Sequence, residues 1–284
     1  MRIVVKVGTS TLAHVATGHL NIRHMEKLCK VLSDVKNAGH EVILVSSGAI
    51  GMGMGKLGLS RRPDTLPGKQ AAAAVGQCEL MYTYDKLFSE YNHTVAQLLL
   101  TASDINDDRR RENFTNTMNT LLDLHALPIV NENDTVATEQ IVIGDNDTLG
   151  AVVAREVEAD LYIILSDIDG LYTADPNKDP DAKLIPLVSE ITEELKAAAG
   201  GSSGSLGTGG MVTKLEAAEI AVNAGCDMII ANGRDPYILY DIMDGKPVGT
   251  RFAAGRKEEV PLQKCFTFLQ NFDRFSCHDT FLRL

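Results

Sequence analysis

Six short runs rich in valine, isoleucine and leucine recur along the chain, and longer segments separate most of them. The apolar residues of each run follow one another without the polar alternation of a half-exposed strand, which is typical of parallel strands buried on both faces. Repeated strand–helix–strand units predict an open, mostly parallel sheet with helices on both sides, a three-layer αβα sandwich. The predicted strands are residues 3–7, 41–45, 94–99, 128–131, 161–165 and 227–231.

The segments between these runs have helical spacing. In the first of them Ile22, Met25, Leu28 and Leu32 recur at the period of a helix, and Gly39 is placed to end it. No internal repeat and no flexible linker divides the body of the chain. The other predicted helices are residues 67–90, 113–125, 148–158 and 211–224.

The charge balance excludes some classes of partner. The chain has 27 basic and 38 acidic residues and a formal net charge of −11, the opposite sign to that of a protein that binds nucleic acid. Its longest apolar runs fall far short of the roughly 20 residues of a membrane-spanning helix, so neither nucleic acid nor membrane is expected as a partner. If the substrate is an anion, local cations or a metal ion must offset the overall negative charge.

The cysteines and the N-terminus predict a cytoplasmic protein. The five cysteines are an odd number without a Cys-x-x-Cys pair, which fits a reducing compartment and argues against a zinc site or a disulfide framework. The chain begins with an expected strand and lacks the layout of a signal peptide. The cysteines are Cys29, Cys78, Cys226, Cys265 and Cys277.

Polar residues follow five of the predicted strands. In open parallel sheets, ligands bind beyond the carboxyl ends of the strands, where such residues converge. The sequence therefore predicts a binding site at that edge of the sheet. The strand ends are Lys6-Val7-Gly8-Thr9-Ser10, Ser46-Ser47-Gly48-Ala49, Asn131-Glu132-Asn133-Asp134, Ser166-Asp167 and Asn232-Gly233.

Two segments are rich in glycine, one after the second strand (48–58) and one before the last predicted helix (200–210). Glycines before a helix let backbone N–H groups approach phosphate oxygens, and the helix N-terminus adds partial positive charge. Both segments thus predict phosphate contacts, although the second alone is also compatible with a surface loop. Thr208 and Lys214 favour the phosphate interpretation, since they add a hydroxyl and a cation.

Two familiar nucleotide motifs fail in the first glycine segment. A Walker A loop at Gly55-Lys56 would need a glycine where Ile50 stands and a serine or threonine where Leu57 stands. A dinucleotide fingerprint matches Gly53, Gly55 and Gly58 by letter, but it begins too far past the strand and has no acidic ribose partner. Nicotinamide binding is therefore not expected.

An acidic cluster precedes a predicted helix at Asp145, Asn146 and Asp147. A capping role at the start of the helix explains why some of these residues are Asp or Asn. Two carboxylates exceed what a cap requires, and beside phosphates they are favourable only if they bind a cation, orient lysines or hold a substrate ammonium. No two of the seven histidines have the spacing of metal ligands, so no metal held by the protein itself is expected.

Six motifs occur in order: Lys6-Val7-Gly8-Thr9-Ser10, Ser46-Ser47-Gly48-Ala49, Asn131-Glu132-Asn133-Asp134, Gly144-Asp145-Asn146-Asp147, Ser166-Asp167 with Gly170-Leu171-Tyr172, and Gly207-Thr208-Gly209-Gly210-Met211 with Lys214. From about Arg2 to Phe252 the chain thereby resembles the amino acid kinase family. The motifs at 131–134 and 207–211 resemble the members that phosphorylate the γ-carboxylate of glutamate. The resemblance implies the αβα fold of that family, ATP and Mg²⁺ as cofactors, and L-glutamate as substrate.

The resemblance also implies a role for each matching position. Lys6 is expected to bridge the transferring phosphoryl group, and Asp147 to orient Lys6 and Lys214. The expected glutamate-binding residues are Ser47, Gly48, Asp134, Asp145 and Asn146. The expected nucleotide-binding residues are Lys6, Gly8, Ser166, Asp167, Thr208, Gly209, Gly210, Met211 and Lys214, and Mg²⁺ is expected to bind through the ATP phosphates.

Further expectations follow from the resemblance alone. They are feedback inhibition by proline, assembly into a homo-oligomer, and a kinase domain at residues 1–255. Many relatives carry an additional C-terminal domain of the PUA type, for which the extension at 256–284 is too short. Two alternatives stay open: a sibling kinase that acts on another carboxylate, and a sensor that binds an amino acid without turnover.

Overall fold

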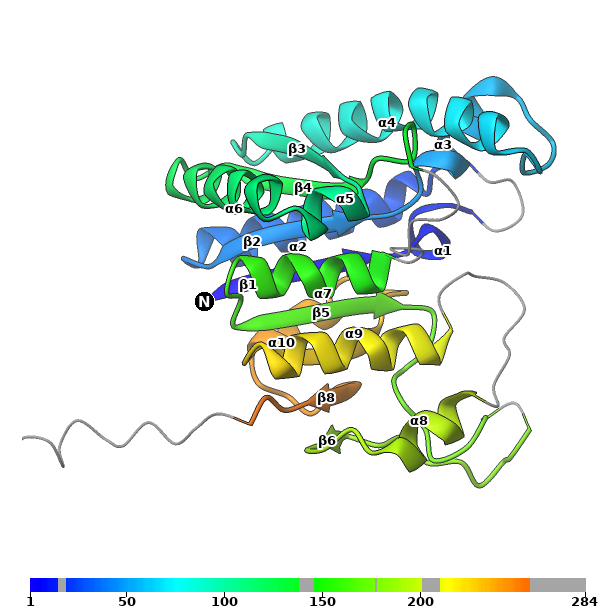
Figure 1. Ribbon diagram of the computed structural model, residues 1–284, viewed down its shortest axis with the longest axis vertical. Helices are drawn as coiled ribbons and strands as arrows, with labels where there is room; N and C mark the ends of the chain where they lie inside the picture. The colour runs from blue at the N-terminus through cyan, green and yellow to red at the C-terminus, as the bar shows by residue number, and fades with distance from the viewer. Residues whose placement is uncertain (15–18, 138–145, 177, 201–209, 256–284) are drawn as a thin grey trace, which may run out of the picture. The chain divides into compact units, whose positions relative to one another are not determined.

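The computed structural model describes residues 1–14, 19–137, 146–176, 178–200 and 210–255. Met1–Ala254 form one compact unit, and the predicted extension at 256–284 lies outside the described residues. Within this unit the described strands form a single sheet (Figure 1). The strands are β1 (Arg2–Val7), β2 (Glu41–Ser46), β3 (Val95–Leu100), β4 (Leu127–Glu132), β5 (Leu161–Ser166), β6 (Leu187–Val188), β7 (Asp227–Asn232) and β8 (Thr250–Phe252).

The sheet is mostly parallel, as the sequence predicts. Its strand order is β3-β4-β2-β1-β5-β7-β8-β6, and only β8 runs antiparallel to its neighbour β7. The six predicted strands are confirmed to within a residue at either end. The sequence missed β6 and β8 because strands this short present too few apolar residues to form a recognisable run.

Helices cover both faces of the sheet, which confirms the three-layer αβα sandwich. One buried cluster joins the sheet to α5, α6, α7 and α9, which lie in front of the strands in Figure 1. A second cluster joins the other face to α2, α4 and α10. The helices are α1 (Thr9–Leu12), α2 (Ile22–Asn37), α3 (Ala49–Leu57), α4 (Leu66–Ser89), α5 (Ala102–Asn106), α6 (Asp108–Asp123), α7 (Asn146–Glu156), α8 (Glu193–Gly200), α9 (Met211–Asn223) and α10 (Ile238–Met243). In the described part of the chain, no helix is both long and apolar enough to cross a bilayer.

Strand β1 lies in the middle of the sheet and directs its side chains alternately to the two cores. Ile3, Val5 and Val7 belong to the cluster with α2 and α4, whereas Val4 belongs to the cluster with α7 and α9. Because successive residues of a strand point to opposite faces, Lys6 projects to the same face as Val4. The lysine therefore points toward the layer that contains α7 and α9.

The first glycine segment, which the sequence predicts to contact phosphate, mostly forms helix α3. Gly48 precedes this helix with a φ of 103°, a left-handed conformation that glycine adopts without strain. The backbone of α3 packs directly against the backbone of α4 where the two helices cross. A methyl group at Gly53 would lie 1.7 Å from the carbonyl oxygen of Ala72, and one at Gly76 would lie 1.7 Å from that of Ala49. Gly53 and Gly76 thus allow close helix packing and are not part of a loop around an anion.

Candidate active site

Two lysines from distant parts of the chain share one buried carboxylate. Lys6 Nζ lies 2.5 Å from Asp147 Oδ1, and Lys214 Nζ lies 2.9 Å from Asp147 Oδ2. Asp147 is fully buried, and Lys6 and Lys214 are 7% and 5% exposed. Burial alone would raise the pKa of Asp147, but the two ammonium groups outweigh it and hold this pKa below its usual range. The carboxylate is therefore ionised at neutral pH.

Local packing explains why Asp147 occupies this position. It begins the buried face of α7, which continues through Gly150, Ala151 and Ala154 at helical spacing. The hydroxyl of Tyr162 on β5 donates a hydrogen bond of 2.8 Å to the backbone carbonyl of Asp147. Gly150 makes room for this contact, since a methyl group there would lie 2.3 Å from the hydroxyl oxygen. The start of α7 is thus fixed against the sheet.

Lys214 is held by the same layer. It lies near the start of α9 and on the buried face formed by Ala217, Ala218 and Ala221. Small residues on that face and on α7 let the two helices pack together. Asp147 thus contacts both Lys6 and Lys214, and the three side chains together carry one net positive charge in a nearly dry cluster.

A cavity of about 240 Å³ adjoins this cluster. Asn146 lines the cavity and directly precedes Asp147, so the two features meet at the start of α7. Four of the predicted glutamate-binding residues line it: Ser47, Gly48, Asp134 and Asn146. The fifth, Asp145, lies outside the described residues.

Hydrogen bonds connect three polar residues of the cavity wall. The amide nitrogen of Asn146 donates to Ser47 Oγ at 2.7 Å and to Asn131 Oδ1 at 3.0 Å. Asn131 is buried, and its Nδ2 has no hydrogen-bond partner among the described residues. One donor of this wall is therefore unused within the described structure.

The cavity also has charged residues that the sequence prediction did not assign to the site, namely Arg62 and Glu132. Glu132 is half-buried, and its burial together with the negative charge of Asp134 raises its pKa to about 7. Burial also raises the pKa of Asp134, against the opposing effect of the Arg62 guanidinium. Glu132 was visible in the sequence as part of a strand end. Arg62 had no signal, since it lies in an irregular segment between α3 and α4.

The predicted nucleotide-binding residues lie at the other side of β1. Ser166 ends β5, and its hydroxyl donates to Asp167 Oδ1 at 3.2 Å. Gly210 and Met211 begin α9, and Gly8 follows β1. The remaining two predicted residues, Thr208 and Gly209, lie outside the part of the chain that the structure describes.

The strand order separates these two groups of residues. Ser47 follows β2 and Asp134 follows β4, both to one side of β1, whereas Ser166 ends β5 on the other side. Lys6 on β1 pairs in register with Val45 of β2 and Ile164 of β5. A ligand in the cavity and a ligand at the end of β5 would therefore meet beside Lys6.

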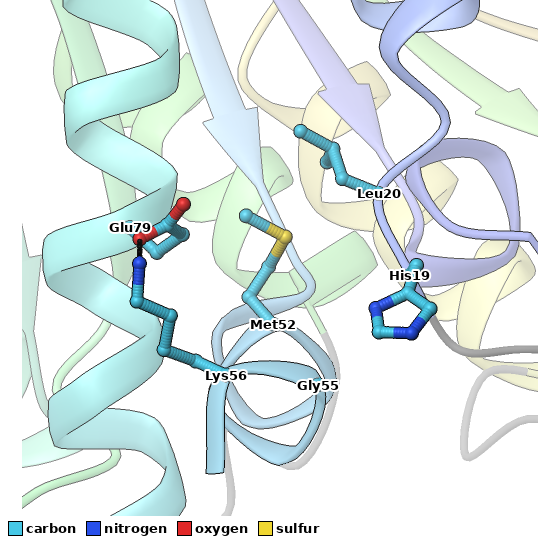
Figure 2. A pocket seen from close by; sticks show the side chains of 6 residues that line it. All are labelled: His19, Leu20, Met52, Gly55, Lys56 and Glu79. Atoms are coloured by element: carbon cyan, nitrogen blue, oxygen red, sulfur yellow. Dashed lines mark hydrogen bonds and ion pairs between the residues drawn. The ribbon is translucent and has the colours of Figure 1, made fainter. Parts of the chain in front are cut away.

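A second hollow of about 170 Å³ is lined by none of the predicted site residues that the structure describes (Figure 2). In it, Lys56 at the end of α3 points to α4, where its Nζ lies 2.8 Å from Glu79 Oε2. This pairing gives Lys56 a counter-ion and agrees with the rejection of a phosphate loop at Gly55-Lys56. The lining residues are His19, Leu20, Met52, Gly55, Lys56 and Glu79.

Comparisons with known proteins bear on the family and the fold of this chain. A sequence model of the amino acid kinase family matches residues 1–232. Glutamate 5-kinase of Clostridium perfringens is 52% identical over 261 residues, which make up 90% of this chain and 97% of that protein. Glutamate 5-kinase of Clostridium tetani is 54% identical over 252 residues, 89% of this chain and 94% of that protein. In fold, the chain is similar to isopentenyl phosphate kinase of T. acidophilum, with a TM-score of 0.62 and 18% identity over 89% of this chain and 100% of the other.

Proposed function

The chain belongs to the amino acid kinase family, and from this premise we propose that it transfers the γ-phosphoryl group of ATP to the γ-carboxylate of L-glutamate. The products are L-glutamyl 5-phosphate and ADP, and the reaction is the first step of proline biosynthesis. The enzyme is thus a glutamate 5-kinase. The observation that carries this proposal is the buried Lys6–Asp147–Lys214 cluster beside a polar cavity.

The cluster supplies what phosphoryl transfer needs. The transferring group spreads negative charge over its equatorial oxygens, so catalysis depends on positioning and on nearby cations. Lys6 and Lys214 provide two ammonium groups in a site with little water, where their effect is strong. Asp147 holds the two at a fixed separation, although like charges repel each other. The acidic chain thereby concentrates positive charge where phosphates would bind.

The acceptor needs no general base. A γ-carboxylate is already ionised at pH 7, so an in-line attack on the terminal phosphorus requires no proton transfer. This accounts for a site assembled without a histidine among its described residues.

The residues of the site also fit a nucleoside triphosphate that carries its own cation. Among the described residues, no three His, Cys, Asp or Glu side chains gather closely enough to hold a metal ion. Mg²⁺ bound through the phosphates of ATP would supply further positive charge to the transferring group. Lys214 and the N-terminus of α9 are the groups we expect to hold those phosphates.

The cavity has the chemistry to hold glutamate. Its acidic side chains, Glu132 and Asp134, suit the substrate ammonium. The side chain of glutamate can then extend toward Asn146 and Lys6.

A coupled assay of ADP release tests the proposal. We expect release that depends on L-glutamate and is far slower with aspartate or acetylglutamate. Preference for another carboxylate would identify a sibling kinase. Calorimetric binding of glutamate without any ADP would instead identify a sensor.

Substitution of Asp134 or Asn146 by alanine is expected mainly to raise the KM for glutamate. Each loses a polar contact in the cavity, a change of about 1.5–3 kcal/mol if the contact is charged, while the residues on the β5 side are unchanged. Steady-state kinetics with each substrate varied in turn will measure this. An unchanged KM for glutamate together with a changed KM for ATP would show that the two subsites are exchanged.

Glutamate binding is expected to weaken below neutral pH. The pKa of Glu132 is raised to about 7, and the substrate ammonium favours its ionised form, so binding at lower pH must first remove a proton. The KM for glutamate should therefore rise by about tenfold from pH 8 to pH 6, and Glu132→Gln should flatten this dependence. An equally steep profile in the variant would assign the titration to another group.

The proposal also includes inhibition by proline, assembly into a homo-oligomer and a cytoplasmic location. Proline presents an α-carboxylate and a nitrogen as glutamate does, and we expect it to inhibit by competing for the same cavity. We also expect a homo-oligomer in the cytoplasm, with neither nucleic acid nor membrane as a partner.

A further inference from the structure

Among the described residues that line the cavity of about 240 Å³, Arg62 is the only one with a cationic side chain. It lies between α3 and α4, so it reaches the cavity from a different element than the acidic residues do. Those acidic residues are Glu132 and Asp134, which follow one another closely at the end of β4. The cavity therefore has an acidic part and a basic part.

The guanidinium of Arg62 is available to a ligand. In the described part of the chain, its nitrogens make no hydrogen bond and no ion pair. Burial raises the pKa of Asp134, and the positive charge of Arg62 acts through space to lower that pKa. An arginine has five donors in a planar fork that matches a carboxylate, and in Arg62 this fork is not used within the described structure.

The charges of glutamate require such a group. Its γ-carboxylate has to reach Lys6 for transfer, and its ammonium suits Glu132 and Asp134. The α-carboxylate is bonded to the same carbon as the ammonium, so it must lie near these two acidic side chains. Without a cation it would be repelled there.

We propose that Arg62 binds the α-carboxylate of the substrate and so makes the enzyme specific for acids that carry one. This inference rests on the proposed glutamate kinase activity. Arg62 thereby selects the substrate at the end opposite to the phosphoryl transfer. A glutamate whose α-carboxylate is masked should lose this contact while it keeps the reacting carboxylate.

A comparison of two substrates with two variants tests the proposal. The substrates are L-glutamate and its α-amide, L-isoglutamine, which keeps the γ-carboxylate and the ammonium. The variants are Arg62→Gln and, as a matched control, Arg61→Gln, since Arg61 is an exposed neighbour that does not line the cavity. The measured quantity is kcat/KM from ADP release at saturating ATP.

We expect Arg62→Gln to lower kcat/KM for glutamate by about 10- to 100-fold, the effect of a hydrogen bond to a charged group. The same substitution should change the value for the α-amide by less than about threefold. Arg61→Gln should resemble the parent with both substrates, and Arg62→Lys should keep part of the preference for glutamate. The loss should lie in KM, because the contact is remote from the phosphorus.

Other outcomes would overturn the inference. Equal losses on glutamate and on the α-amide would mean that Arg62 only shapes the cavity or neutralises Asp134. Equal effects of Arg61→Gln and Arg62→Gln would mean a general charge effect. If the parent enzyme releases no ADP with glutamate, the proposed function fails and the inference fails with it, whereas a normal parent with an unaffected Arg62→Gln variant rejects the inference alone.

Discussion

Substitution of Lys6 by alanine is expected to lower kcat by about 10³-fold, with a smaller change in either KM. Lys6 is a buried cation near the end of the central strand β1, 2.5 Å from Asp147 and beside both the cavity and the end of β5. Its charge is needed most when the phosphoryl group is in transfer, so the loss should fall on kcat. Steady-state and single-turnover measurements of ADP formation will show this, and Lys214→Ala should behave in the same way.

A matched control is Lys56→Ala. Lys56 is also a lysine paired with a carboxylate, but it lies in the second hollow and is 60% exposed in its side chain. We expect near-normal kcat from this variant. If Lys6→Ala or Lys214→Ala is folded, as judged by circular dichroism and thermal unfolding, and keeps a kcat close to that of the parent, the assigned role of the lysine is wrong.

The second large effect concerns Asp147. Its replacement by asparagine leaves two buried ammonium groups without the carboxylate between them, and removal of one partner from a buried ion pair costs about 3–5 kcal/mol. We expect a loss of this order in the free energy of unfolding in urea, together with a large loss of kcat. The pKa of Asp147 is lowered in the folded protein, so its contribution is present above its unfolded pKa of about 3.9 and is lost as the pH falls through the lowered value.

A double variant separates stability from catalysis. In Asp147→Asn/Lys214→Met one of the two uncompensated charges is removed as well, so part of the lost stability should return while activity stays low. If Asp147→Asn alone unfolds at the same urea concentration as the parent, the shared carboxylate does not stabilise the lysines in the way that the distances indicate.

The fold could be predicted because its strands are buried on both faces. Runs such as 42–45 and 161–165 are continuously apolar, a pattern typical of an internal parallel strand. Convergence of Lys6, Ser47 and Ser166 then followed from topology, since parallel strands end at one edge of the sheet. The proximity of Asp147 and Lys214 to that edge rested on the family resemblance, and their distances support it.

What the sequence did not predict depends on contacts between distant elements. The sequence did not predict helix α3 for the glycines after β2, because nothing local shows that Gly53 meets Ala72 of another helix. Arg62 gave no signal, since its place in the cavity is set by the course of an irregular segment and not by a periodic pattern. The raised pKa of Glu132 likewise requires the burial that the tertiary structure provides.

The number of residues in β1 that precede Lys6 determines which face of the sheet its side chain projects from. Their pairing with β2 and β5 fixes which side of the sheet each of them faces, and a shift by one residue turns every side chain of a strand to the opposite side. A single residue inserted between Ile3 and Lys6 would then direct the ammonium group into the hydrophobic core on the α2 face of the sheet. The sheet itself could still form. A peptide tag joined ahead of Met1, in contrast, leaves the register of β1 with β2 and β5 unchanged.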